Sequence, residues 1–272
     1  MLCLIQNVNS QRLYGSLTAG YQYILSQDQP PTYIINSHHQ ITSPWFWRRE
    51  SLSFKNSLTA KLKIGYELND IFGLELSGSY FNTSIEQNSS VSTRHVLKGG
   101  FWRITPSFVV NVPYEAIDFY TRIGVSMIGG KIRYRQFFQL DSPANSFSKN
   151  TLGYEYTGPI SIGFNGSVGI RKRINKLISL IVEIEFIYQN FSPNKGHTKS
   201  YEFDGEDQLA SYEYPRVDTE IDFGEEQAFA GYQIQDKNVP EKLYRRNYSL
   251  SGFAFNIGIR FELWSKSESE EV

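Results

Sequence analysis

Apolar and polar residues alternate through long stretches of this chain, and this alternation limits the possible fold more than any other feature. Between residues 58 and 67, Leu58, Leu62 and Ile64 alternate with polar or small residues. Because successive side chains of a strand point to opposite faces, such a segment predicts a strand with one apolar and one polar face. We find the pattern in eight segments: 13–25, 58–67, 74–80, 102–112, 119–127, 160–170, 180–189 and 252–263.

The length of these segments favours a membrane-spanning sheet. Strands of soluble sheets usually have about five or six residues, whereas most of the segments here alternate for about ten or more. About ten tilted residues is the length that crosses the hydrocarbon of a bilayer. The composition agrees with β structure, because 15% of the residues are aromatic and 21 are glycine. A formal net charge of −1 argues against a strongly basic nucleic-acid binder, so we expect no nucleic acid as a partner.

The connections between the predicted strands are alternately short and long. Short ones fall near 69–70, 112–116 and 171–176, and long ones cover about 26–55, 82–99, 131–155 and 191–246. In an up-and-down barrel this order puts all short turns at one rim and all long loops at the other. The sequence therefore predicts an all-β, eight-stranded antiparallel up-and-down transmembrane β-barrel, with short periplasmic turns and four long extracellular loops. Alternation in 218–223 and 228–235 leaves open that strands continue beyond the membrane, or that an extra hairpin makes ten strands.

The same pattern also fits a soluble lipid-binding barrel or β-sandwich, in which the apolar face points inward. The small, sparsely charged polar face argues against this alternative, because a water-exposed surface carries more charge. Aromatic residues near strand ends also favour interface girdles: Tyr21, Tyr23, Tyr80, Phe81, Tyr188, Phe261 and Trp264.

The charges on the polar face are nearly balanced, and desolvated charges must be paired. We therefore expect a charge network inside the barrel, and eight strands make a lumen just wide enough to be filled by its own side chains. The expected members are Lys61, Lys63, Glu67, Glu75, Arg103, Arg122, Glu183, Glu185, Arg260 and Glu262.

The last predicted strand, GFAFNIGIRFELW, carries the most specific resemblance. The chain resembles the small eight-stranded outer-membrane barrels of the outer membrane protein A and outer membrane protein X type. The resemblance implies a bacterial outer-membrane protein whose terminal strand is recognised by the barrel-assembly machinery, through Phe253, Phe255, Ile257, Ile259, Phe261 and Trp264. The polar tail after Trp264 departs from the family, whose barrel-only members end at the terminal aromatic. In style the sequence is similar to outer-membrane proteins of Bacteroidota.

The two ends of the sequence are expected to lie outside the barrel. Residues 1–11 look like the remnant of a secretory signal peptide. The barrel is expected to cover 12–264, and 265–272 to form a disordered acidic tail. Cys3 is the only cysteine, so no disulfide can form within the chain.

Histidines are the main candidates for chemistry, but their positions do not favour an enzyme. His38, His39, His95 and His197 all fall in predicted long loops, and none stands beside both a serine and an acid on a strand. No spacing requires a metal or cofactor. The acidic run from 202 to 226 contains FDGED, a fragment of a calcium-loop pattern, and we interpret it as a solvated loop.

The first predicted loop contains the aromatic run Trp45, Phe46 and Trp47, followed by Arg48 and Arg49. These residues could anchor the loop at the outer leaflet, with the arginines on lipopolysaccharide phosphates, or dock a partner protein. A cluster that caps the mouth of the barrel is an equal alternative.

Together these features predict a structural or interaction protein of the outer membrane. We expect its long loops to contact outer-membrane lipid, lipopolysaccharide or an outer-membrane protein partner, as a subunit of an assembly or alone. A narrow, porin-like channel is the first alternative, and an enzyme that modifies lipid A or phospholipid at the rim is the second.

Overall fold

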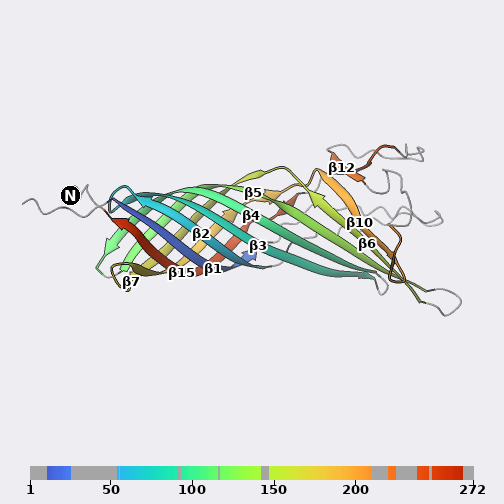
Figure 1. Ribbon diagram of the computed structural model, residues 1–272, viewed down its shortest axis with the longest axis horizontal. Helices are drawn as coiled ribbons and strands as arrows, with labels where there is room; N and C mark the ends of the chain where they lie inside the picture. Colours follow the sequence, from blue (N-terminus) through green and yellow to red (C-terminus); the bar gives the residue numbers. More distant parts are fainter. Residues whose placement is uncertain are drawn as a thin grey trace, which may run out of the picture.

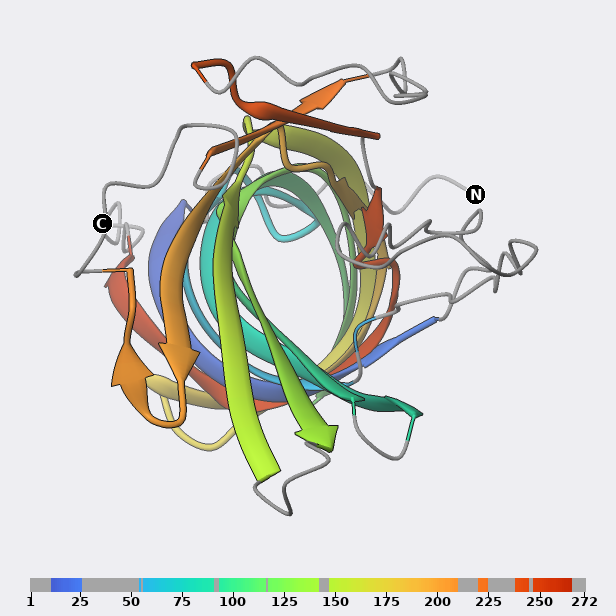
Figure 2. The same ribbon diagram turned by 90° about the vertical axis from the view of Figure 1, so that its right-hand side faces the viewer.

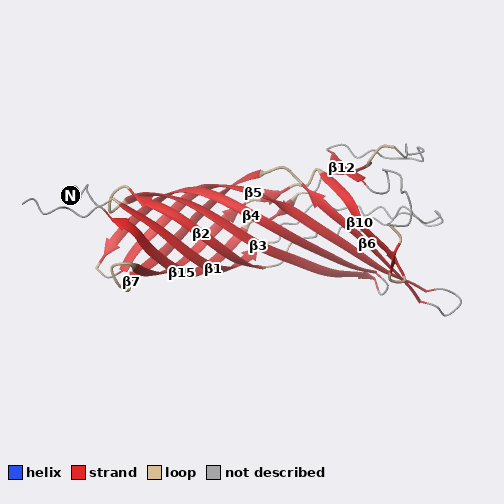
Figure 3. Cartoon of the chain, in the orientation of Figure 1, coloured by secondary structure: helices blue, strands red, loops and turns tan. Residues whose placement is uncertain are grey.

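A computed structural model describes residues 11–25, 54, 56–90, 93–115, 117–141, 147–209, 220–224, 238–244 and 247–265. In this part of the chain no helix is long and apolar enough to cross a membrane. Figure 1 shows an elongated molecule that is built of tilted strands, and Figure 3 shows that the described elements are strands joined by turns.

Eight antiparallel strands form a closed barrel. In order around it, the strands are β1 (Arg12–Ile24), β2 (Ser57–Glu67), β3 (Phe72–Ser90), β4 (Thr93–Tyr114), β5 (Ile117–Asp141), β7 (Ser161–Arg173), β8 (Ile178–Tyr188) and β15 (Gly252–Ser265). The pairing of β1 with β15 and of β5 with β7 closes the ring. The predicted eight-stranded barrel is therefore confirmed, and a ten-stranded barrel is excluded.

Tight turns join β2 to β3, β4 to β5, and β7 to β8 at one end, which we call the short-turn end (Figure 1). Asparagine stabilises two of these turns: the side-chain oxygen of Asn69 accepts hydrogen bonds from the backbone of Ile71 and Phe72, at 2.9 and 2.7 Å. Asn175 does the same for Leu177 and Ile178. Asparagine side chains commonly form such local bonds, and this explains the short connections seen in the sequence.

At the opposite end, which we call the hairpin end, three strands continue past the barrel. β3, β4 and β5 have 19, 22 and 25 residues, longer than the eleven of β2 or β8. Much of the segments 82–99 and 131–155, expected as loops, is therefore strand. The alternation continues there, but the outer face is polar. Ser84 and Glu86 point outward in this part of β3, whereas Leu74 and Leu76 point outward in the part that belongs to the barrel. A search for alternation between apolar and polar residues misses a strand of this composition.

The barrel branches at β5. Its first half, up to Ile128, pairs with β7, and its second half, from Lys131, pairs with β6 (Phe147–Thr157). Gly129 and Gly130 lie between the halves, where a Cβ on Gly130 would be 2.3 Å from the backbone oxygen of Gly100. The close approach of the two strands thus requires glycine at this position.

The second half of β5 starts a sheet that extends beyond the barrel, which we call the extension. β6 pairs with β10 (Lys195–Phe203), which pairs with β11 (Glu206–Asp207) and β12 (Glu220–Gly224), and β12 pairs with β13 (Glu241–Tyr244). Strand β12 covers part of the predicted alternation at 218–223 and belongs to the extension. Asp204 and Gly205 have φ of 49° and 90° in the turn between β10 and β11. The FDGED segment is therefore a hairpin with an Asp-Gly turn.

The two faces of the barrel strands differ as the sequence predicts. Leu62, Ile162 and Ile259 are 60%, 73% and 42% exposed on the outside. On the inside, Lys63, Arg122 and Glu185 are 2%, 7% and 5% exposed. An apolar outer wall around a charged interior fits a lipid bilayer and excludes a water-soluble carrier, which has the reverse arrangement. The described strands therefore form a membrane-spanning β-barrel.

Exposed aromatic side chains mark both ends of this outer wall. At the hairpin end they are Tyr21, Tyr23, Tyr80, Trp102, Tyr188 and Phe253, and at the short-turn end Phe72, Phe108, Tyr114, Phe119, Phe261 and Trp264. Such belts are typical of membrane interfaces. The expectation for Phe81 is wrong: its side chain is buried in the barrel interior, because it follows Tyr80 and so points to the opposite face.

Candidate functional site

The lumen of the barrel contains many charged side chains. They form three groups, which we call levels, at successive heights along the barrel axis. Nearest the short-turn end, Glu67 accepts from Arg171 and Arg260, both at 2.8 Å. Arg171 also reaches Asp118 at 2.8 Å, and Arg260 reaches Glu262 at 2.9 Å. These five residues come from β2, β5, β7 and β15, so the ion pairs connect opposite walls.

The middle level is centred on Arg122, whose two terminal nitrogens bind the carboxylates of Glu75 and Glu183. Glu183 also accepts from Lys63 at 2.8 Å and from the Tyr120 hydroxyl at 2.9 Å. All of these side chains except that of Tyr120 are less than a tenth exposed. A carboxylate buried this deeply is stable only with such partners.

A third level lies closer to the hairpin end, around Glu185. Its carboxylate binds Lys61 and the Asn165 amide, and Asn256 donates to it at 3.3 Å and to Glu183 at 3.1 Å. Nine of the ten residues that we expect to line the lumen as a charge network take part in ion pairs, and only Arg103 does not. Tyr14, Tyr120 and the two amides were not among the expected residues, because tyrosines and amides carry no charge. Asp118 was not expected because it precedes the predicted strand 119–127, whereas β5 begins at Ile117.

Space in this lumen is tight, and glycine makes room for two tyrosine rings. The Tyr14 ring lies 3.6 Å below the Arg260 guanidinium, and its hydroxyl donates to Glu75 at 2.9 Å. A Cβ on Gly65 would lie 2.1 Å from this ring, and a Cβ on Gly169 would lie 2.4 Å from Tyr120. The small residues of the polar face are therefore needed for packing.

This crowding gives a testable prediction. Gly65→Ala is expected to lower the free energy of unfolding by about 1–3 kcal/mol, since the added methyl must displace a ring fixed on two sides. Gly78→Ala is the matched control, because a Cβ there meets nothing within 4 Å. Urea unfolding in detergent, followed by heat-modifiable gel migration, measures both. Equal stability of the two variants would contradict the packing described for Tyr14.

Arg103 marks a boundary in the lumen. Its side chain is 1% exposed, its guanidinium lies 4.9 Å from the Phe81 ring, and none of its nitrogens has a hydrogen-bond partner among the described residues. Near this level Ser126 donates to Gln189 at 2.9 Å, and Gln22 donates to the Leu250 carbonyl at 2.9 Å. The described interior beyond this boundary is mainly apolar, although Thr83, His95 and Gln136 are buried there as well.

An apolar cluster closes the lumen at the hairpin end, and we call it the aromatic cap. Phe101 is at its centre, 5.7 Å from Phe54, 5.5 Å from Phe81 and 5.2 Å from Phe191 between ring centroids. The remaining members are Ile24, Leu97, Ile128, Ile132, Tyr134, Tyr156, Ile221, Tyr248 and Leu250. This cap is not predicted from the sequence, because alternation indicates a polar inner face along the whole of each strand.

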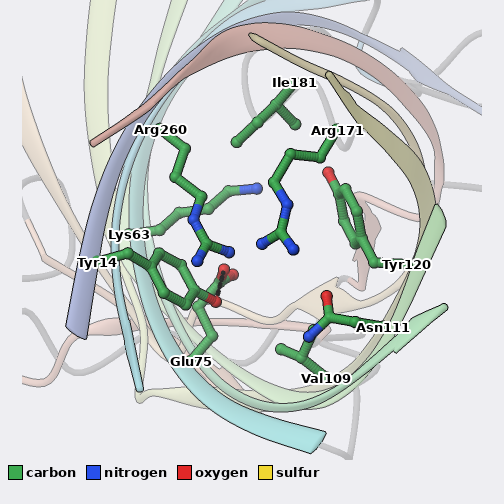
Figure 4. Close-up of a pocket in the computed structure, with 9 residues that line it drawn as sticks. All are labelled: Tyr14, Lys63, Glu75, Val109, Asn111, Tyr120, Arg171, Ile181 and Arg260. Atoms are coloured by element: carbon green, nitrogen blue, oxygen red, sulfur yellow. Dashed lines mark hydrogen bonds between the residues drawn. The ribbon is translucent and has the colours of Figure 1, made fainter. Parts of the chain in front are cut away.

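The remaining free space in the lumen is small. Figure 4 shows Lys63, Arg171 and Arg260 pointing towards the middle of the barrel, with Tyr14 and Tyr120 beside them. The cavity that they line, together with Glu75, Val109, Asn111 and Ile181, has a volume of about 20 Å³, room for roughly one water. The side chains therefore leave little free space at this height of the lumen.

The two histidines in the described part of the chain, His95 and His197, have different surroundings. No cluster of three or more possible metal ligands occurs among the described residues. His95 is buried, with its Nδ1 2.6 Å from the Tyr134 hydroxyl, and His197 is exposed on β10. His38 and His39, together with the aromatic run Trp45–Trp47 and Arg48 and Arg49, lie outside the described residues.

Comparisons with known proteins find similarity to solved structures at low sequence identity. No family model and no curated protein matches the sequence. Among solved structures, the chain is similar to the outer membrane protein OprG from Pseudomonas aeruginosa, with a TM-score of 0.49 and 10% identity over 94% of this chain and 97% of that one. It is also similar to Ail, the attachment invasion locus protein of Yersinia pestis, with a TM-score of 0.35 and 10% identity over 94% and 99% of the two chains.

Proposed function

We propose that this protein is an interaction protein, in which a filled outer-membrane barrel holds the extension outside the cell for contact with a partner. The observation that carries the proposal is the contrast between the two ends. At the short-turn end the strands stop in tight turns, whereas at the hairpin end β3, β4 and β5 continue well beyond the barrel (Figures 1 and 2). A barrel that is blocked inside and elaborated on one side is suited to display rather than to transport.

The tip of β10 is a suitable place to detect a partner. Phe203 is 43% exposed there, next to the Asp204–Gly205 turn, and a large apolar side chain so far from the bilayer is available for a protein contact. We expect a photo-crosslinking residue at position 203 to give a discrete adduct with another envelope protein in intact cells. The same residue at Leu177, which is exposed at the short-turn end, is the control.

The outcome at position 203 separates display from the other functions. A reproducible adduct at 203 and none at 177 supports the proposal. If positions along β10 give no adduct under conditions in which the barrel is folded and surface-exposed, the proposal of a protein partner is wrong.

A narrow channel is the second candidate, supported by the charged side chains in the part of the lumen nearer the short-turn end. The aromatic cap and the network around Arg122 oppose it, since an ion would have to pass both. We therefore expect no discrete conductance from the purified barrel in planar bilayers. Steps in conductance that change when Lys63 or Glu185 is neutralised would favour the channel instead.

The terminal strand supports a proposal about biogenesis. Strand β15 exposes Phe253, Phe255, Ile257, Ile259, Phe261 and Trp264 on its outer face. It pairs with β1 and β8 and so closes the ring. We assign to this strand the contact with the barrel-assembly machinery, because β15 must be held until it pairs with β1 and the ring closes.

A further inference from the structure

A row of basic residues on the outside of the barrel begins where the apolar wall ends. Trp102 of β4 and Gly129 of β5 are directly opposite each other, and the Trp102 ring lies over the glycine, where a Cβ would be 2.4 Å from it. Ile104 and Met127 are the pair before, on the side of the bilayer. Trp102 therefore marks the membrane interface at this part of the wall.

The outward positions beyond Trp102 carry positive charge. Lys131 comes first, opposite Gly100, then Lys98 opposite Arg133, and then Arg135 opposite Val96. All four basic side chains are exposed, Lys131 by 46% and Arg133 by 63%. We call this set of Lys98, Lys131, Arg133 and Arg135 the basic face.

The basic face is poorly neutralised by the protein itself. Lys98 and Arg133 are directly opposite on neighbouring strands, an arrangement of like charges that destabilises a sheet. Glu155 of β6 is the acid paired with this face, 3.1 Å from Lys131 and 3.2 Å from Arg133. Burial opposes ionisation of Glu155, but hydrogen bonds from Lys131 and Arg133 hold the pKa of its carboxyl below the usual value. Lys131 and Arg133 therefore share one carboxylate, and the neighbouring Glu86 pairs with Arg94 at 2.8 Å, so that Lys98 and Arg135 form no ion pair among the described residues.

The height of the basic face matches the headgroup region. Two residues of a strand tilted by about 40° rise roughly 5 Å along the membrane normal. Lys131 therefore lies about 5 Å above the Trp102 level, and Lys98 and Arg133 about 10 Å above it. The polar layer of a bilayer extends roughly 5–8 Å beyond the hydrocarbon on each side. The first three cations thus lie at the level of the lipid phosphates or just above them.

We propose that the basic face binds the phosphate groups of lipid A in the outer leaflet. The lipid's acyl chains would pack on the apolar wall around Trp102 and Ile104, while Lys131, Lys98 and Arg133 hold its phosphates in charge-assisted hydrogen bonds. This inference rests on the proposed function only in that the hairpin end faces outward. It assigns lipid contact to the barrel wall, independently of the residues 45–49 on which the sequence analysis placed it.

Binding of lipid A to the purified barrel in detergent tests this proposal and does not depend on a protein partner. Native mass spectrometry measures the affinity of lipid A, phosphatase-treated lipid A and phosphatidylglycerol for the wild type and for the double variant Lys98→Gln/Arg133→Gln. The double variant Lys172→Gln/Arg173→Gln removes the same charge from the exposed short-turn end and is the matched control. Heat-modifiable migration confirms that all three proteins are folded.

We expect the wild type and the control to bind lipid A equally, and K98Q/R133Q to bind it at least tenfold more weakly. Removal of the lipid phosphates should weaken binding to the wild type by a similar factor, and added salt should reduce the difference. Three outcomes overturn the proposal: equal affinity in K98Q/R133Q, no effect of dephosphorylation, or phosphatidylglycerol binding as tightly as lipid A. Binding of a soluble sulfated polysaccharide to the basic face in preference to lipid A would also overturn it.

Discussion

Arg122→Leu is expected to destabilise the barrel by about 3–5 kcal/mol, the range found when one partner of a buried ion network is removed. The leucine would leave the carboxylates of Glu75 and Glu183 facing each other in the lumen, with Lys63 as the nearest remaining cation of Glu183. Urea unfolding of the detergent-solubilised or vesicle-inserted protein measures the effect. The loss should be partly recovered at low pH, where protonation of the carboxylates removes their repulsion.

A partly exposed ion pair at the short-turn end provides the control. Arg12 and Asp70 are 3.0 Å apart, with side chains 27% and 37% exposed. Because surface pairs contribute about 0–1 kcal/mol, Arg12→Leu should change stability little. If Arg122→Leu and Arg12→Leu are equally stable, the lumen pairs do not hold the walls together and the description of the network is wrong.

Val168→Arg gives the second large effect. Val168 is 51% exposed on the apolar outer wall of β7, near the middle of its height, where it lies opposite Thr121 and Ile184 and faces acyl chains. A charged residue at the bilayer midplane of a β-barrel costs about 2–4 kcal/mol, falling to about 0–1 near the interface. The same change at Leu177, in the turn between β7 and β8, should therefore have little effect.

Folding into lipid vesicles separates these two variants, because the penalty depends on depth in the bilayer. We expect Val168→Arg to require lower urea for unfolding and to insert more slowly than Leu177→Arg. In a soluble barrel, both positions would be wet and both changes would be harmless. Equal stability of the two variants in vesicles would thus argue against a bilayer around Val168.

The sequence predicts the barrel well because the physics of its two faces is simple. Alternation in segments such as 58–67 requires no knowledge of the fold, and an apolar wall with a charged interior is stable only when the sheet closes. The sequence also predicts that Glu183 and Glu185 have cationic partners in the lumen, since cations on the same face of the strands must neutralise them. Which cation meets which carboxylate depends on the stagger of the strands, and that is not readable from one sequence.

The aromatic cap and the extension could not be predicted in the same way. Phe101 and Ile128 are apolar and yet point inward, opposite Trp102 and Met127 on the outside, so that both faces of these strands are apolar where the cap begins. Continuous apolar stretches do not show which side faces lipid. Beyond the membrane the outer face of the strands becomes polar, while the side chains of Leu97 and Ile132 on the inner face are apolar and buried. The polar face is then on the outside instead of the inside, and the sequence of such a strand resembles that of a loop.

Accessibility of spin labels along β2 tests the central claim most directly. Single cysteines at positions 60 to 64, in a variant whose Cys3 is replaced by serine, carry a nitroxide in lipid vesicles. Labels at Leu62 and Ile64 should collide readily with oxygen, which concentrates in the hydrocarbon, and little with a water-soluble nickel complex. Labels at Lys61 and Lys63 should be protected from both, because these side chains are buried in the filled lumen. Nickel access at 62 and 64, with oxygen access at 61 and 63, would contradict the account.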